Sequence, residues 1–394
     1  MDAVFRADVP YLNPDRIRHT AGIGIGIGIG IGIEPTTLLS AVAAVTRHIG
    51  VVGTVSTSFS EPYNVARTFA TLDHLSGGRV GWNVVTSAFG ERNFRLDELP
   101  SQEERYARAA EFVDVARGLW SGWERDAWRV DRRAGVFADP DRVHRLDHRG
   151  RFFQVEGPLD IPRSPQGEPV LVQAGASGPG RAFAAGFAEL IFTAAQSADQ
   201  AREFRSDIRE LAVAAGRSAD DLVVLPGIKT IVAETEREAA ALNRELRDLI
   251  DAEAGRADLE KVMGFVDLSG IGLDERIPAE RLAFDERALG RRQSGPALFR
   301  RLALAHGYTV RQLVEEQVIS AGHKIVVGTP ESVADLLQEW HASGAADGFV
   351  VIPAVANASA FLDGVVPLLQ KRGVFRRDYE ADTLRAHLGL PGRG

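Results

Sequence analysis

The chain has 394 residues, of which 45% are hydrophobic and 25% are charged, and its formal net charge is −8. This acidic balance argues against a general nucleic-acid binder, which presents a basic face. The lack of cysteine excludes disulfides, thiolate metal sites and cysteine nucleophiles. No apolar run reaches membrane-spanning length, and the first residues lack the basic and apolar regions of a secretory leader. The composition therefore predicts a cytoplasmic globular protein.

The first 33 residues contain one predicted strand and one repeat. Residues 2–7 are expected to form a short strand that ends at Asp8. Residues 22–33 are six consecutive Gly-Ile pairs. Their alternation would place every Ile on one face of an extended segment, but glycine raises the entropy cost of ordering that segment. We therefore interpret the repeat as a low-complexity loop.

From Glu34 onward, apolar strands alternate with amphipathic helices. Strands are predicted at 49–58, 79–87, 169–173, 189–193, 222–229, 324–327 and 348–352. Helices are predicted near 35–49, 62–75, 98–120, 179–187, 197–215, 234–253, 330–342 and 357–370. Parallel strands joined by crossover helices fit this alternation, in either a (β/α)₈ barrel or a doubly wound sheet. Two longer stretches, at about 121–168 and 254–322, are expected to be insertions within one domain.

The strand at 79–87 carries a carboxamide in the middle of an apolar run. Val80, Val84 and Val85 predict burial on both faces, yet Asn83 lies between them. A buried amide without a hydrogen-bond partner costs roughly 1–3 kcal/mol. Asn83 is therefore either a structural residue bonded to a neighbouring loop or a ligand contact at the end of a strand, and the strand alone leaves both open.

Small and hydrogen-bonding residues dominate the predicted strand ends, where parallel α/β folds place their sites. These ends hold Asp8, 56–58, Asn83, Thr86, Ser87, 173–178, Thr193 and 226–229. They contain neither a His and carboxylate cluster of the kind that binds a metal nor an activated nucleophile. The run 173–180 is either a plain tight turn or a phosphate holder at a helix start. Such a lining suits a bound cofactor that carries the chemistry itself.

Several motifs occur together in a recognisable order and spacing. They are Glu61–Asn64, Arg79–Ser87, Arg105-Tyr106, Leu119-Trp120, Pro165–Gly167, Gln173–Ser177, Gly328–Glu331 and Ala346–Phe349. In this arrangement the chain resembles the bacterial-luciferase-like FMN-dependent monooxygenases, in particular the branch of nitrilotriacetate and dibenzothiophene-sulfone monooxygenases. The resemblance extends from Asp2 to about Pro391.

The resemblance implies a TIM-like (β/α)₈ barrel with insertions. It also implies a two-component monooxygenase that uses O₂ and reduced FMN, which a separate NAD(P)H:flavin reductase supplies. One oxygen atom would enter a small sulfur, nitrogen or hydrocarbon compound, whose identity the sequence leaves open. Homo-oligomers are expected from the same resemblance.

Six residues fall on positions that contact FMN in this family: Asp8, Thr57, Asn83, Gln102, Tyr106 and Ser177. The resemblance implies that Ser177 and Tyr106 hold the phosphate and that Asn83 and Thr57 lie along the ring system. Gln102 stands where a histidine is common. His323 is the candidate for acid–base work, against the alternative of a surface or core histidine.

The chain departs from the family at its start. Residues 2–8 resemble the second barrel strand, so the first strand and helix are expected to be absent and seven barrel strands to remain. A non-catalytic or truncated paralogue is therefore one alternative function. A barrel oxidoreductase that uses a deazaflavin coenzyme for hydride transfer is another.

Overall fold

A computed structural model describes residues 1–11, 32–87, 89–175, 178–264, 266–283, 294–320, 322–354 and 358–393. Most of the Gly-Ile repeat and the predicted phosphate contact Ser177 lie outside these ranges. Within them, no helix is both long and apolar enough to cross a membrane.

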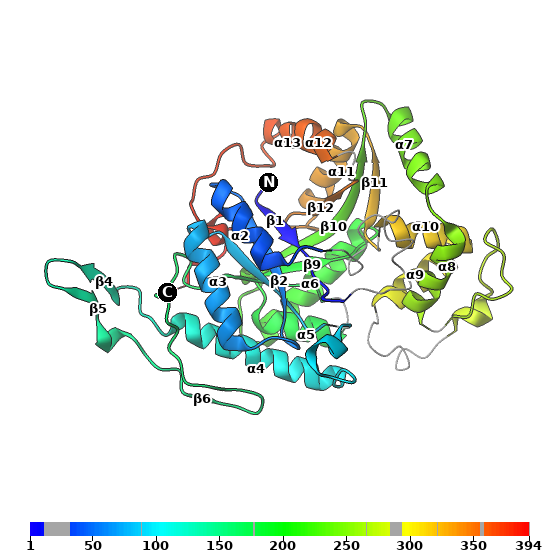
Figure 1. Ribbon diagram of the computed structural model, residues 1–394. Coiled ribbons are helices and arrows are strands. Elements are labelled where there is room, and N and C mark those ends of the chain that lie inside the picture. The colour runs from blue at the N-terminus through cyan, green and yellow to red at the C-terminus, as the bar shows by residue number, and fades with distance from the viewer. Residues whose placement is uncertain are drawn as a thin grey trace.

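The centre of the fold is an eight-stranded parallel sheet that curls into an open barrel wall (Figure 1). Its strands are β1 (Ala3–Arg6), β2 (Gly50–Ser56), β3 (Val80–Val85), β8 (Val170–Gln173), β9 (Leu190–Thr193), β10 (Val223–Val232), β11 (Lys324–Gly328) and β12 (Val350–Pro353). They follow the order β1-β2-β3-β8-β9-β10-β11, and β12 also pairs with β10. The predicted TIM-like fold class is confirmed.

The long strand β10 supports both of the last two strands. Its first half pairs with β9, while its second half pairs with β11 and β12. Within the described residues the barrel wall thus has seven strands, namely β1, β2, β3, β8, β9, β10 and β12, and β11 is an extension beside β10. Between β1 and β12 no pairing occurs in the described ranges, so the wall has two edges.

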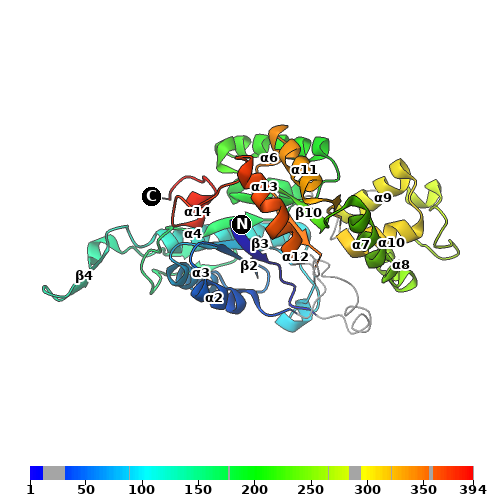
Figure 2. The same cartoon turned by 90° about the horizontal axis from the view of Figure 1, so that it is seen from above.

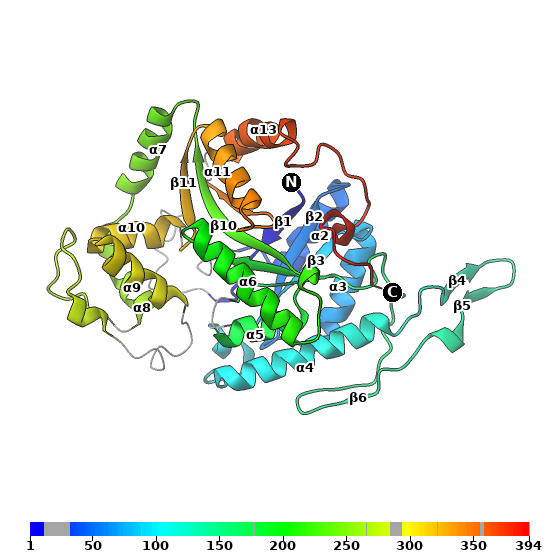
Figure 3. The same ribbon diagram turned by 180° about the vertical axis from the view of Figure 1, so that it is seen from behind.

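Helices cover the outer face of the wall, as the view from behind shows (Figure 3). They are α2 (Pro35–Val45), α3 (Pro62–Ser76), α4 (Gln102–Ser121), α5 (Gly178–Phe187), α6 (Ala198–Ala214), α7 (Glu236–Asp248) and α11 (Pro330–Ala342). The largest hydrophobic cluster lies between strands β2, β3, β8, β9 and the first of these helices. Trp82 is fully buried there, packs against Phe69 and Phe112, and donates its indole N–H to the Val55 carbonyl. The helix predicted at 357–370 consists of α12 (Ala358–Ala360), a π-helical turn at Phe361–Val365 and α13 (Val366–Lys371).

The two insertions project from opposite ends of the molecule when it is seen from above (Figure 2). The first contains two hairpins, β4 (Trp128–Asp131) with β5 (Val136–Ala138) and β6 (His148–Arg149) with β7 (Gln154–Val155). The second packs α8 (Ala252–Met263), α9 (Ser294–His306) and α10 (Val310–Ser320) around a hydrophobic cluster of their own.

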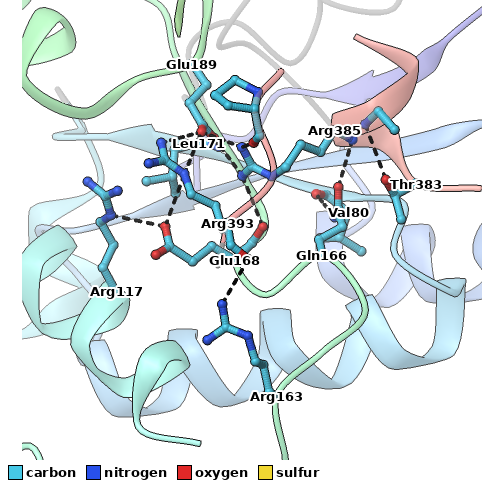
Figure 4. Close-up of polar contacts among 12 residues, drawn as sticks. Val80, Arg117, Arg163, Gln166, Glu168, Leu171, Glu189, Thr383, Arg385 and Arg393 are labelled. Atoms are coloured by element: carbon cyan, nitrogen blue, oxygen red, sulfur yellow. Dashed lines mark hydrogen bonds and ion pairs between the residues drawn. The ribbon is translucent and has the colours of Figure 1, made fainter. Parts of the chain in front are cut away.

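The C-terminal segment closes the bottom of the wall, at the amino ends of the strands. Leu384, the first residue of the short helix α14 (Leu384–His387), and Leu390, which follows this helix, pack against the inner face of β2, β8 and β9. Below them Glu189, whose side chain is 1% exposed, forms an ion pair with the buried Arg385. Both guanidinium NH₂ groups of Arg385 donate to this carboxylate, at 2.5 and 2.9 Å, and Arg393 donates to it as well (Figure 4).

Candidate active site

A cavity of about 1880 Å³ lies inside the curve of the sheet and is lined by β1, β2, β3, β8, β9 and β10. Its lining is mainly apolar, with Phe192 and Leu225 from the strands and Leu298 and Phe299 from the second insertion. Ligand sites are concave, mostly apolar and marked by a few placed polar groups. Those polar groups therefore decide what the cavity can bind.

Asn83 presents an unpaired carbonyl oxygen to this cavity. Side chains alternate between the two faces of a strand, and the pairing of β3 with β2 sets Asn83 directly opposite Thr54. The Asn83 amide nitrogen donates to the Thr54 hydroxyl at 2.9 Å, and this hydroxyl donates to the Arg6 carbonyl of β1. The Asn83 Oδ1 atom is buried and has no hydrogen-bond partner in the described structure. It is thus a fixed acceptor that lacks a donor.

A second unpaired acceptor lies at the end of β8. Gln173 lines the cavity, is 5% exposed, and its Oε1 atom has no hydrogen-bond partner among the described residues. The chain then turns towards α5 through Gly175, where an added Cβ would stand 2.4 Å from that oxygen and 2.8 Å from the Gly180 carbonyl. Only glycine fits this turn, which brings the amino end of α5 close to the cavity rim.

Three of the predicted cofactor contacts, besides Asn83, lie at the cavity: Asp8, Gln102 and Tyr106. Gln102 begins α4, and the ring of Tyr106 packs against Phe183 of α5 at 5.3 Å between centroids. Burial, followed by the negative charge of Glu34, raises the pKa of the Asp8 carboxyl above its ordinary value. Together with Asn83 of β3, these residues come from three separate parts of the chain and line the same cavity.

Thr57 is placed differently from the other predicted contacts. It is fully buried, and its hydroxyl donates to the Val85 carbonyl at 3.1 Å. It is not part of the cavity lining. Its contact with a flavin stays a prediction, as does that of Ser177, which lies outside the described residues.

Arg105 fixes the loop that follows β3. Its guanidinium donates to the carbonyls of Thr86 and Ser87 at 3.1 and 2.5 Å. Ser87 has a φ of 36°, a conformation that costs energy in a non-glycine residue, and its hydroxyl bonds to Ser56 at 2.7 Å. The hydrogen bonds from Arg105 and to Ser56 hold this strained residue in place at the cavity.

His323 and Lys229 lie at another part of the cavity wall. The His323 ring packs over Gly227 of β10, where an added Cβ would stand 2.1 Å from Nδ1, and this Nδ1 has no partner among the described residues. Burial, and then the nearby charge of Lys229, lower the pKa of His323 to about 4. The imidazole is therefore neutral at pH 7. Its role in acid–base chemistry stays a prediction.

Sequence reasoning missed Thr54 and the loop-fixing role of Arg105. Thr54 could have been found from the two-residue period of β2, because it is separated from the inward-facing Val52 by one residue. No sequence pattern indicated the role of Arg105, because its hydrogen-bond acceptors are main-chain carbonyls 18 and 19 positions earlier in the sequence.

Comparison with known proteins identifies the family of this chain. The family model described as luciferase-like monooxygenase matches residues 19–347. The chain belongs to this family. Among luciferase-like monooxygenases, it is 45% identical to N-acetyl-S-(2-succino)cysteine monooxygenase of Bacillus subtilis, over 91% of this chain and 81% of the relative. It is 42% identical to nitrilotriacetate monooxygenase component A of Aminobacter aminovorans, over 91% and 79%.

Two further comparisons agree with this assignment. Dibenzothiophene-sulfone monooxygenase of Rhodococcus erythropolis is 39% identical over 91% of this chain and 79% of the relative. A crystal structure of the riboflavin lyase RcaE with modified FMN and riboflavin superimposes with a TM-score of 0.83 at 33% identity, covering 100% of this chain and 86% of that one. The luciferase-like family, the monooxygenase class and the branch that the sequence indicated are confirmed.

Proposed function

We propose that this luciferase-like monooxygenase uses reduced FMN and O₂ to insert one oxygen atom into a small organic substrate. The observation that carries the proposal is the pair of unpaired acceptors, Asn83 Oδ1 and Gln173 Oε1, in an apolar cavity at the strand ends. A buried polar atom without a partner costs about 1–3 kcal/mol. A ligand that brings hydrogen-bond donors to both atoms recovers that cost, and the ring N–H and ribityl hydroxyls of FMN are such donors.

The residues around these two acceptors fit the rest of the cofactor. Tyr106 and the amino end of α5 would hold the phosphate, because a helix amino end favours an anion. Asn83, with Thr54 behind it, would accept from the ring, and Gln102 and Asp8 would border the same side. Reduced FMN supplies the electrons that activate O₂, while the apolar walls exclude water from the reaction.

A separate NAD(P)H:flavin reductase is the partner that this proposal requires. The name of the Aminobacter relative, component A, indicates a protein that works together with another component. The substrates named for the relatives are small organic molecules, among them a substituted cysteine, nitrilotriacetate and dibenzothiophene sulfone. We extend this class, rather than any single compound, to the present chain.

We also propose that the two insertions and the barrel wall form one domain. In support, Arg247 of α7 pairs with Glu315 and Glu316 of α10. The Gln196 side chain after β9 donates to the Gly322 carbonyl before β11 at 2.9 Å. Homo-oligomer formation remains part of the proposal and is checked by light scattering.

Flavin titration tests the cofactor assignment. Oxidised FMN in air and reduced FMN under anaerobic conditions are titrated into the parent chain and into Asn83→Ala. Loss of one hydrogen bond of about 0.5–1.5 kcal/mol weakens binding by roughly 2- to 13-fold. Coupling to a flavin reductase and NADH under ¹⁸O₂ then assays insertion of one labelled oxygen atom across sulfur, nitrogen and hydrocarbon compounds.

Asn243→Ala is a matched control for this titration. Asn243 on α7 also has a buried amide oxygen without a partner among the described residues, but it does not line the cavity. We expect its FMN affinity to equal that of the parent. A parent chain that binds no FMN, or equal losses in both variants, would refute the assignment.

A further inference from the structure

Lys229 is unusual because nearly all of the basic side chains in this chain are arginines. It is one of only four lysines, against 42 arginines. It lies on β10, two residues beyond Gly227 and therefore on the same inward face, and it lines the cavity. Burial lowers the pKa of its ammonium group. A half-buried cation therefore lies at a mainly apolar cavity wall.

The described residues provide no counter-charge for this cation. No ion pair or hydrogen bond of Lys229 occurs in the described ranges, and two carboxylates of the cavity lining are paired with arginines. Asp347 pairs with Arg205 at 2.7 Å, and Asp2 pairs with Arg376 at 2.9 Å. A partly desolvated charge without a partner has a free-energy cost, and a bound ligand of opposite charge lowers that cost.

His323 adds a hydrogen-bonding group at the same place. The absence of a side chain at Gly227 leaves room for its ring, whose Nδ1 is buried without a partner among the described residues. Lys229 stands two residues beyond Gly227 on the same face of β10, which places it beside this ring. A point charge beside a neutral hydrogen-bonding ring suits the oxygens of an oxyacid anion.

We propose that Lys229 and His323 bind an anionic oxygen group, a carboxylate or sulfonate, on the substrate of this enzyme. The proposal rests on the proposed monooxygenase function and names its substrate class. The flavin acceptors lie on β3 and β8, and β9 separates β8 from β10. The cation is therefore on a different strand from the expected cofactor contacts, on the wall that the substrate would share.

Calorimetric titration with tricarballylate, a redox-inert tricarboxylate, tests the anion subsite. The titration uses the full chain saturated with oxidised FMN, at pH 7.5, and neutral tricarballylamide serves as the uncharged probe. We expect the parent to prefer the anion by at least tenfold, Lys229→Met to lose that preference, and Lys229→Arg to keep part of it. His323→Ala should weaken tricarballylate binding about threefold or more.

Lys324→Met is the matched control. It removes the same charge on the neighbouring strand β11, outside the cavity lining, and should leave both affinities unchanged. If Lys229→Met weakens FMN as much as tricarballylate, the lysine faces the cofactor and the proposal is wrong. If the parent binds FMN but shows no preference for the anion, the substrate class is wrong and the monooxygenase function stands. If the parent binds no FMN, it is the function that fails.

Discussion

The buried ion pair under the barrel gives a prediction with a defined magnitude. In Glu189→Gln the carboxylate disappears, while Arg385, with a side chain 4% exposed, keeps its charge. An uncompensated buried charge costs about 3–5 kcal/mol. An unfolding entropy of about 2.1 cal/mol/K per residue amounts to roughly 0.8 kcal/mol/K for the whole chain, so the melting temperature should fall by about 4–6 °C. Differential scanning calorimetry measures this change.

Acid should remove the difference between Glu189→Gln and the parent. Burial alone would raise the pKa of Glu189, but the hydrogen bonds and charges of Arg385 and Arg393 hold it below the ordinary value of 4.5. A lowered folded-state pKa means that the contribution is complete above the unfolded value and is lost as the pH falls through the folded value. The melting-temperature gap should therefore be constant from pH 8 to about pH 5 and shrink below about pH 4.

An exposed pair provides the comparison. Glu156 and Arg145 are 66% and 65% exposed, and a surface pair of this kind contributes about 0–1 kcal/mol. Glu156→Gln should therefore melt within about 1 °C of the parent. The double variant Glu189→Gln with Arg385→Met should recover part of the loss, because it removes the stranded cation. A single variant Glu189→Gln that melts like Glu156→Gln would show that Arg385 finds another acceptor and would refute the reasoning.

Three further substitutions test how the cavity is built. Gly175→Ala places a Cβ 2.8 Å from the Gly180 carbonyl and should lower the melting temperature and weaken FMN binding, as measured by calorimetry; a neutral outcome would mean that the turn can shift. Thr54→Val removes the only hydrogen-bond partner that the Asn83 amide nitrogen has among the described residues, and it should cost about 1–3 kcal/mol in urea unfolding. An unchanged midpoint would contradict this hydrogen-bond chain. Gly227→Ala displaces the His323 ring. The pKa of His323, followed by NMR, should therefore rise from about 4 towards 6.5. A pKa that stays near 4 would show that the ring remains buried.

The order of strands and helices could be predicted from the sequence because most elements are regular and apolar. The strand predicted at 79–87 is β3, and the helix predicted at 98–120 is α4. The pairing of β11 with β10 could not be predicted. This pairing depends on β10 extending beyond β9 to Val232. The sequence of a continuous apolar strand does not indicate where its pairing with one neighbouring strand ends and its pairing with the next begins.

The candidate site was only partly predictable, for a related reason. Asn83 stands out in its strand because a carboxamide in an apolar run must have a partner. Its partner Thr54 is ordinary within the run Gly50–Ser56, and only the register between β2 and β3 sets it opposite Asn83. The ion pair Glu189–Arg385 joins positions 196 residues apart in the sequence, and no local sequence pattern predicts an ion pair between residues so far apart.

The two parts of the cavity should respond independently to mutation because they depend on different strands. The Asn83 and Gln173 acceptors depend on contacts among β1, β2, β3 and β8. Lys229 and His323 depend on β10 and on the turn before β11. The pairing between β8 and β9 and that between β9 and β10 are main-chain ladders, which transmit little of a side-chain truncation. Substitutions without shared partners usually add within about 0.3–0.5 kcal/mol, so Asn83→Ala combined with Lys229→Met should lose cofactor and anion affinity in amounts equal to those of the single variants.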